Sequence, residues 1–172
     1  MAEGVFSKLA ESLQKALDEK GWTPTPVQQV TQDEISSGGD RLIVAPTGSG
    51  KTMAAMLPLL DRCLSEGWQG MSILYITPLR ALNRDVDRRL EEITTAVGLR
   101  LGLRHGDTTQ SERTKQVRKP PNVMITTPET FQIMFTGSKL RELLKSVQAV
   151  VIDELHDMAG GERGWQLSVG IS

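Results

Sequence analysis

The stretch APTGSGKT at residues 45–52 constrains this chain more than any other part of its sequence. The apolar run LIV at 42–44 precedes it and predicts a buried strand, while MAAML at 53–57 begins a helical pattern. Gly48 and Gly50 permit backbone conformations in which successive N–H groups point at phosphate oxygens. Strand, glycine-rich turn and Gly-Lys-Thr at a helix start together predict a phosphate-binding loop, although Ala45 replaces the usual first glycine. The alternative is a strand–turn–helix corner that contains Gly-Lys-Thr by chance.

In such a loop, a lysine reaches the β- and γ-phosphates and a hydroxyl binds Mg²⁺, roles that fall here to Lys51 and Thr52. The N-terminus of the following helix adds partial positive charge. The residues predicted to hold the nucleotide in the loop are Thr47, Gly48, Ser49, Gly50, Lys51 and Thr52. The loop alone indicates only a nucleoside triphosphate, with no preference for one base.

Four further apolar runs predict strands, at residues 71–77, 99–103, 123–126 and 147–152. Helical patterns lie between them, at 51–66, 79–97 and 111–119, and a further helix opens at 127–129. This alternation predicts an α/β fold, a parallel sheet with helices on both faces. Ligands of such sheets collect at the carboxyl ends of the strands, where the motifs of this sequence lie.

The first 40 residues predict helices that precede the sheet. Apolar residues at helical spacing indicate one amphipathic helix over residues 4–19, with a stop at Gly21. An extended loop follows, and Thr25 is the expected N-cap of a helix that starts at Pro26 and runs to about Ser36. Gln28 would then lie in its first turn.

Composition limits the compartment and the partners. The 172 residues suit one domain, and the net charge of −1 means that nucleic-acid binding would need a local basic patch. Cys63 is the only cysteine, which excludes an internal disulfide and fits a reducing compartment; the expected localisation is cytoplasmic. No stretch has the length of a membrane span or the apolar block of a signal peptide, so no membrane partner is expected.

Asp153 and Glu154 directly follow the last predicted strand. Carboxylates there are costly to desolvate unless a cation compensates them, and Mg²⁺ held by Thr52 and the phosphates is the natural partner. Asp153 would bind the ion through water, and Glu154 would position and deprotonate the attacking water. The alternative is an ordinary helix start, where acids are favoured.

Several motifs together resemble superfamily 2 helicases. DELH at 153–156 resembles motif II and APTGSGKT resembles motif I, while TPTPVQ at 23–28 is similar to the Q motif. TPLRAL at 77–82 resembles motif Ia, TTPE at 126–129 resembles motif Ib, and HGDT at 105–108 resembles the element between them. Four segments are similar to helicases of the Lhr (large helicase-related) type, with Ski-type helicases next nearest. They are YITPLRALNRDV, RHGDT, ITTPET and VIDELHDMAGGERGWQL.

The resemblance implies a RecA-like motor domain that uses ATP and Mg²⁺. It implies that Gln28 recognises adenine and that His156 couples the nucleotide site to motif III and a second motor domain. A lone histidine is otherwise more often structural. Residues 1–172 would form a single, partial first RecA-like domain, without the second domain and its arginine finger, so the chain alone is expected to turn over ATP poorly.

Two Thr-Pro corners predict contacts to the backbone of single-stranded or partly duplex nucleic acid. Each stands at a strand end and opens a helix, which offers hydroxyl and N–H donors to phosphates. The predicted contact residues are Thr77, Pro78, Arg80, Thr126, Thr127 and Glu129. Weaker candidates, for which a solvated helix face is the alternative, are Arg84, Arg104, Arg113, Lys115, Arg118 and Lys119. The residues do not separate DNA from RNA; the resemblance favours DNA.

Two other functions compete with an ATP-driven helicase or translocase. One is a phosphate-loop ATPase of another class, such as a kinase or a transporter subunit. The other is an ATP-regulated module that binds nucleic acid without unwinding it. The Gln28 motif, both Thr-Pro corners and DELH favour the helicase over the first of these.

Overall fold

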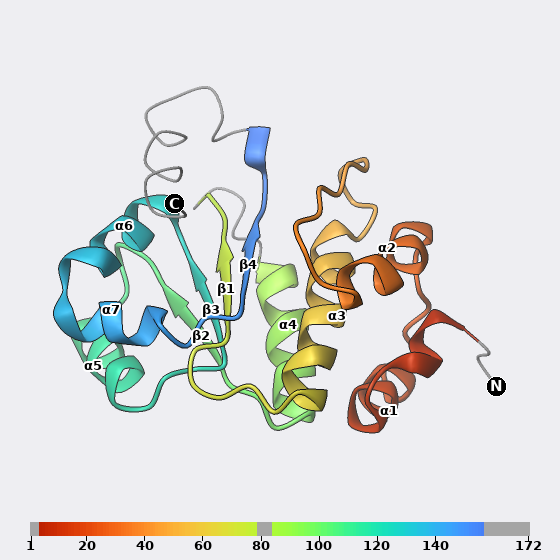
Figure 1. The fold of residues 1–172 in the computed structure, drawn as a ribbon, viewed down its shortest axis with the longest axis horizontal. Helices are drawn as coiled ribbons and strands as arrows, with labels where there is room; N and C mark the ends of the chain where they lie inside the picture. Colours follow the sequence, from red (N-terminus) through yellow and green to blue (C-terminus); the bar gives the residue numbers. More distant parts are fainter. Residues whose placement is uncertain (1–3, 79–83, 157–172) are drawn as a thin grey trace. The chain divides into compact units, whose positions relative to one another are not determined.

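The computed structural model describes residues 4–78 and 84–156, with the side chains of 84–87 left out. The chain forms two compact units (Figure 1). The first comprises residues 1–68 and 89–98, and the second comprises residues 69–88 and 99–172. The prediction of a single partial RecA-like domain over residues 1–172 stays a prediction. In the described part, no helix combines the length and the apolar character needed to cross a bilayer.

The first unit is helical. It contains the 3₁₀ helix η1 (Val5–Lys8), the helices α1 (Glu11–Glu19), α2 (Pro26–Ser36) and α3 (Lys51–Ser65), and the later part of α4 (Arg84–Ala96). Its fully buried side chains include Leu13, Leu17, Met56, Leu57 and Leu60. Burying a leucine-sized side chain contributes about 1.5–3 kcal/mol, so these helices are held by their apolar faces.

Pro58 lies inside α3 and cannot donate the helical hydrogen bond to the carbonyl of Ala54. The hydroxyl of Thr31, on α2, lies 3.4 Å from that carbonyl oxygen. The Thr31 hydroxyl donates to the Val27 carbonyl at 2.9 Å, so its contact with the Ala54 carbonyl is a weaker second one. This α2–α3 contact forms near the start of the predicted phosphate-loop helix.

The second unit is built on a parallel sheet of β1 (Ile73–Ile76), β2 (Leu101–Arg104), β3 (Val123–Thr126) and β4 (Ala149–Ile152). The order is β2-β3-β1-β4, and Tyr75 is opposite Ile125 on β3 and Val151 on β4. Helices α5 (Gln110–Arg118), α6 (Pro128–Thr136) and α7 (Ser138–Leu144) complete the unit (Figure 1). The core between the sheet and α6 and α7 comprises Met71, Leu74, Ile76, Met124, Phe131 and Met134.

Most predicted elements are present, and two predictions were wrong. The amphipathic helix over 4–19 is interrupted at Leu9, which has extended backbone, so η1 and α1 are separate. The strand at 42–44 is not formed: Leu42 and Val44 are 76% and 86% exposed, and no strand of the described sheet pairs with them. A three-residue apolar run becomes a strand only when a neighbour supplies its ladder hydrogen bonds, which this segment lacks.

Candidate nucleotide and nucleic-acid site

The backbone of residues 45–52 has the form that the sequence predicts. Gly48 and Gly50 have φ of 78° and 91°, in the left-handed region, and Gly50 is the N-cap of α3. The Ser49 N–H donates to the Pro46 carbonyl at 3.2 Å, which closes the turn. The Ser49 hydroxyl is buried and has no hydrogen-bond partner in the described part of the chain. A buried orphan hydroxyl beside a helix start fits a phosphate oxygen, which would accept its proton.

Lys51 points its ammonium back into the loop. Its Nζ donates to the carbonyls of Ala45 at 2.8 Å and Pro46 at 3.1 Å. A bound triphosphate would replace these two carbonyls as the hydrogen-bond partners of the ammonium. An ammonium bonds more strongly to anionic phosphate oxygens than to neutral carbonyls. In the unliganded chain, the ammonium is thus held by carbonyls of its own loop, beside the predicted phosphate site.

Gln28, predicted to read adenine, is 3% exposed and braces the loop. Its Nε2 donates to the Gly50 carbonyl at 3.3 Å, and its Oε1 accepts from the Thr25 N–H at 3.1 Å and from Trp22 Nε1 at 3.4 Å. The φ of 91° at residue 50 favours glycine, and a Cβ there would lie 2.7 Å from Gln28 Nε2 and displace its amide. Thr25 is the N-cap and Pro26 the first residue of α2, as predicted.

The acidic motif lies at the carboxyl end of β4. The Asp153 N–H donates to the Ile76 carbonyl at 2.9 Å, and Asp153 Oδ1 accepts from the Glu154 N–H at 2.9 Å. Asp153 Oδ2 accepts a hydrogen bond from the hydroxyl of Tyr75, which is buried on the neighbouring strand. The carboxylate is fixed from both sides, which suits a group that holds a hydrated cation by its oxygens.

Glu154 has a φ of 52° and is the non-glycine residue with positive φ in the described backbone. Such a conformation costs about 1–3 kcal/mol and is concentrated at functional sites. The Glu154 carboxylate lies 3.3 Å from His156 Nε2, and its side chain is 28% exposed. The strained backbone thus turns a carboxylate and an imidazole together at the strand end.

The two Thr-Pro corners differ in how their hydroxyls are used. Thr126 is buried and donates to the Arg104 carbonyl at 2.9 Å, and Thr127 caps α6 by accepting from the Thr130 N–H at 3.4 Å. The Thr77 hydroxyl is buried with no partner among the described residues. Pro78 is buried and Glu129 is exposed, while Arg80 lies outside the described residues. Only Thr77 therefore has a hydroxyl that still lacks a partner for a predicted phosphate contact.

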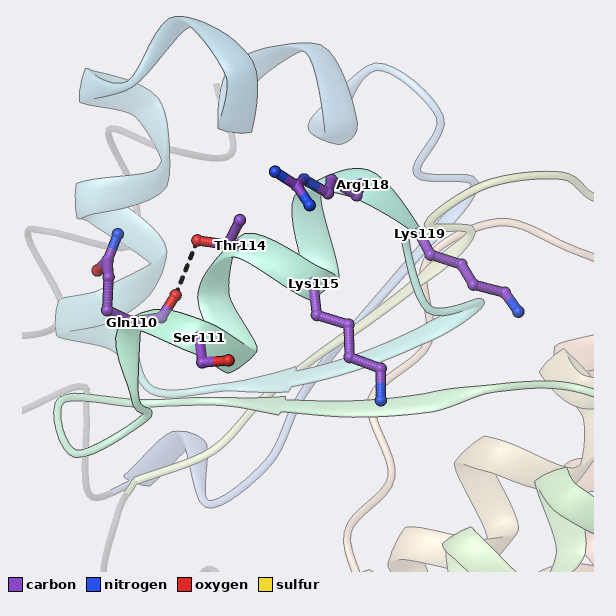
Figure 2. A pocket seen from close by; sticks show the side chains of 6 residues that line it. All are labelled: Gln110, Ser111, Thr114, Lys115, Arg118 and Lys119. Atoms are coloured by element: carbon purple, nitrogen blue, oxygen red, sulfur yellow. Dashed lines mark hydrogen bonds between the residues drawn. The ribbon is translucent and has the colours of Figure 1, made fainter.

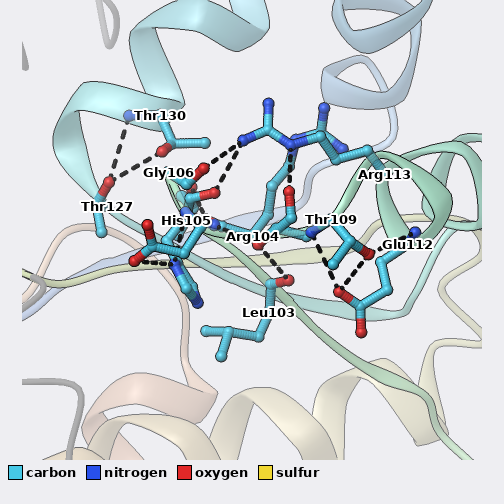
Figure 3. A network of polar contacts seen from close by, with 12 residues as sticks. Leu103, Arg104, His105, Gly106, Thr109, Glu112, Arg113, Thr127 and Thr130 are labelled. Atoms are coloured by element: carbon cyan, nitrogen blue, oxygen red, sulfur yellow. Dashed lines mark hydrogen bonds and ion pairs between the residues drawn. The ribbon is translucent and has the colours of Figure 1, made fainter.

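The loop after β2 is held by one arginine (Figure 3). Arg113 donates to the carbonyls of His105 and Gly106 at 3.0 Å and of Thr108 at 2.9 Å. Arg104 is buried and donates to Gln116 Oε1 at 3.2 Å. Its burial and the nearby charge of Arg113 lower the pKa of the Arg104 guanidinium. Arg104 and Arg113 are thus mainly structural, since they fix the HGDT loop from inside.

The structure brings together three groups of predicted residues: Gln28 with the phosphate loop, Asp153 with Glu154 and His156, and Thr126 with Thr127. The phosphate loop belongs to the first unit, and the other groups belong to the second. Sequence reasoning missed Tyr75 and the brace from Trp22. The signal for Tyr75 was a single polar-tipped aromatic inside the run MSILYIT, two residues before a Thr-Pro corner.

Comparison with protein families matches residues 25–172 to the DEAD/DEAH box helicase model. Among curated proteins, the chain is 41% identical over 169 residues to the Lhr helicase/uracil glycosylase of Escherichia coli, covering 86% of this chain and 11% of that protein. It is 36% identical over 186 residues to the ATP-dependent helicase Lhr-Core protein 2 of Thermococcus barophilus, covering 98% of this chain and 22% of that protein. The chain thus spans less than a quarter of the length of these relatives.

Among solved structures, the Mycobacterium smegmatis helicase Lhr bound to ssDNA and AMP-PNP superposes with a TM-score of 0.86 at 35% identity. The match covers 98% of this chain and 23% of that one. The predicted RecA-like α/β fold and the predicted resemblance to Lhr-type helicases are both confirmed.

Proposed function

The chain belongs to the DEAD/DEAH box helicase family, and from that premise we propose that it is part of the first motor domain of an ATP-dependent helicase or translocase acting on DNA. The observation that carries the proposal is the phosphate loop. Gly48 and Gly50 are left-handed, Lys51 opens a 15-residue helix, and the Ser49 hydroxyl is buried without a partner.

In this proposal, residues 47–52 cradle the triphosphate and Lys51 exchanges its two carbonyl contacts for the β- and γ-phosphates. Thr52 and Asp153 would hold Mg²⁺, which neutralises phosphate charge when bound. Glu154 takes the proton of the attacking water, and His156, 3.3 Å from it, transmits the state of the nucleotide site to the second RecA-like domain. Gln28 recognises adenine while its amide stays hydrogen-bonded to the Gly50 carbonyl.

For nucleic acid, we propose that residues 77–80 and 126–129 bind phosphates of one strand. The Thr77 hydroxyl without a partner and the start of α6 after Thr127 are the donors that support this. They offer no bidentate pair for base edges, so sequence preference should be slight. DNA as the substrate is supported by the ssDNA in the M. smegmatis Lhr structure. Cytoplasmic localisation belongs to the same proposal.

Two measurements test the proposal. Isothermal titration of the chain with ATP and Mg²⁺ should show binding that Lys51→Ala removes. Salt titration of single-stranded DNA binding should show that Arg80→Ala weakens all sequences similarly and lowers the salt slope by about one unit. A Lys51→Ala variant with wild-type affinity would refute the phosphate-loop assignment. An unchanged slope, or a loss confined to one sequence, would remove Arg80 from the phosphate contacts.

A further inference from the structure

A groove runs along the outer face of α5, with a volume of about 400 Å³ (Figure 2). The side chains that line it come from successive turns of the one helix and from the residue that follows it. These are Gln110, Ser111, Thr114, Lys115, Arg118 and Lys119. We call this surface the α5 groove. All six residues are exposed, so their side chains are available to a ligand.

The α5 groove is strongly basic in a chain that is nearly neutral. Residues 110–119 carry four cations and one acid, a net charge of +3 against −1 for the whole chain. One of the four, Arg113, is turned inward to the HGDT loop. The other three, Lys115, Arg118 and Lys119, form no ion pair within the described residues.

The acids that could neutralise the α5 groove are engaged elsewhere. Glu112 accepts from the Thr109 hydroxyl at 3.1 Å, and Asp107 lies 3.7 Å from His105. On α7, which packs near α5, Glu142 pairs with Lys145 at 2.8 Å. The same helix also carries Lys139 and Arg141, both exposed.

The dipole of α5 stabilises cations in its last turn, which is a sufficient reason for one or two of them. Lys115, Arg118 and the C-cap Lys119 all lie at this end of the helix, where they also repel one another. Lys115 lies three and four residues before Arg118 and Lys119, and like charges at these spacings destabilise a helix by about 0.2–0.5 kcal/mol per pair. A bound polyanion would offset this repulsion.

We propose that the α5 groove is a second contact for the phosphodiester backbone of nucleic acid, beyond the two Thr-Pro corners. The inference rests on the proposed function for its choice of polyanion. The helix begins after β2, at the carboxyl edge of the sheet, where the Thr126–Thr127 corner also lies. It ends before β3 begins, at the opposite edge, about 13 Å further along its axis. A strand that leaves the corner can therefore continue along α5.

The chemistry of the α5 groove favours backbone over bases. Lysine ammonium groups are point charges that bind phosphate without distinguishing the neighbouring bases. The Ser111 hydroxyl can donate to a phosphate oxygen, whereas the Thr114 hydroxyl is committed to the Gln110 carbonyl at 2.8 Å (Figure 2). Contacts along α5 should thus add affinity and salt dependence for long strands and leave sequence preference unchanged.

The test compares the chain with a triple variant, Lys115→Ala/Arg118→Ala/Lys119→Ala, in binding to oligonucleotides of about 6 and about 20 nucleotides. We expect the variant to bind the long strand about tenfold more weakly at moderate salt, with a salt slope lower by about two units, since each phosphate contact to a single strand contributes about 0.7. Binding of the short strand and of ATP should be unchanged. The conservative variant Lys115→Arg/Lys119→Arg, which keeps the charges, should keep the wild-type slope.

The control removes three cations of the first unit, Lys8, Lys15 and Lys20, each of which already lies within 4.0 Å of an acid. The net charge falls equally, so an equal slope change in the control would overturn the inference. It would also be overturned if wild type bound long DNA and the α5 variant bound it equally well, which would leave the surface to an acidic protein segment and the proposed function intact. A wild-type chain that bound no DNA would refute the proposed function itself, and the inference with it.

Discussion

The phosphate loop and the acidic motif both hold polar groups at the end of an apolar segment, but by different means. The loop depends on side chains: Gln28 bonds the Gly50 carbonyl, and Lys51 bonds the carbonyls of Ala45 and Pro46. The acidic motif depends on the adjacent strand β1, whose Ile76 carbonyl accepts from the Asp153 N–H and whose Tyr75 hydroxyl donates to the carboxylate.

The difference separates what must move from what is already in place. To bind phosphates, Lys51 has to exchange its bonds to two carbonyls, so the loop is expected to rearrange on binding. The Asp153 carboxylate is positioned without any ligand, by the Tyr75 hydroxyl and the Glu154 N–H. Regions with few backbone partners also open more easily, which puts the loop at the less stable end of the chain.

The largest expected effect tests the rigid side of the comparison. In a protein that carries both RecA-like domains of the proposed function, Glu154→Gln should lower ATP hydrolysis by about 10²–10⁴-fold, because glutamine is nearly isosteric but cannot take a proton from water. Nucleotide affinity should stay near wild type. Single-turnover hydrolysis measures the first quantity and equilibrium titration the second. Hydrolysis at wild-type speed would take the general-base role away from Glu154.

The next effect tests the movable side. Lys51→Ala removes charge-assisted bonds worth about 1.5–3 kcal/mol each and should weaken ATP binding by about 100-fold or more. In the unliganded chain, it should also speed amide exchange across residues 45–50, because the ammonium no longer ties the loop together. Lys8→Ala, a surface lysine paired with Asp33, is the control. Unchanged exchange would mean that the loop holds its form without Lys51.

Gln28→Ala sharpens the comparison, because this side chain has a predicted role in adenine reading and an observed role in bracing. Loss of the bond to Gly50 should weaken ATP and GTP alike by about fivefold, the value of about 1 kcal/mol. Loss of adenine reading should weaken ATP by a similar further factor. Titration with both nucleotides separates the two. Equal losses would leave Gln28 as a brace alone, and an unchanged GTP affinity would remove the brace.

The sequence predicted those parts of the fold that local patterns determine. The strand at 123–126, the strand at 149–152 (predicted at 147–152) and the helix start at Pro26 could be predicted, because apolar runs, a Thr N-cap and proline act over a few residues. The strand at 42–44 could not, since the same apolar pattern forms a strand only if another segment pairs with it. The break at Leu9 likewise depends on tertiary contacts, such as the Ala10 N–H on the Asp61 carboxylate at 2.5 Å.

Site residues followed the same division. Gly48 and Gly50 were predictable from the requirement for positive φ, and Thr127 from its place before a helix-opening proline. The hydrogen-bond partners that occupy or orient the site side chains could not be predicted. Thr126 bonds a carbonyl 22 residues away, and Tyr75 bonds an aspartate 78 residues away. Only the strand order, with β2 beside β3 and β4 beside β1, brings such pairs together.

The smallest expected effect concerns Tyr75, the positioning residue behind Asp153. Tyr75→Phe keeps the buried ring and removes the hydroxyl that fixes the carboxylate, so one orienting hydrogen bond of about 1 kcal/mol is lost. ATP affinity should fall about fivefold at low Mg²⁺ and recover as Mg²⁺ is raised, because the freed carboxylate can still be recruited by the ion. Titration of ATP binding over a range of Mg²⁺ concentrations measures this.

Thr94→Val is the matched control for Tyr75→Phe. It also removes a buried hydroxyl, which donates to the Leu90 carbonyl at 2.8 Å, and Thr94 lies far along the sequence from the acids. If both variants lost the same stability and only Tyr75→Phe changed the Mg²⁺ dependence, the hydroxyl would act through Asp153. Identical Mg²⁺ curves for wild type and Tyr75→Phe would show instead that the sheet alone positions the acid, and the contrast with the phosphate loop would be sharper still.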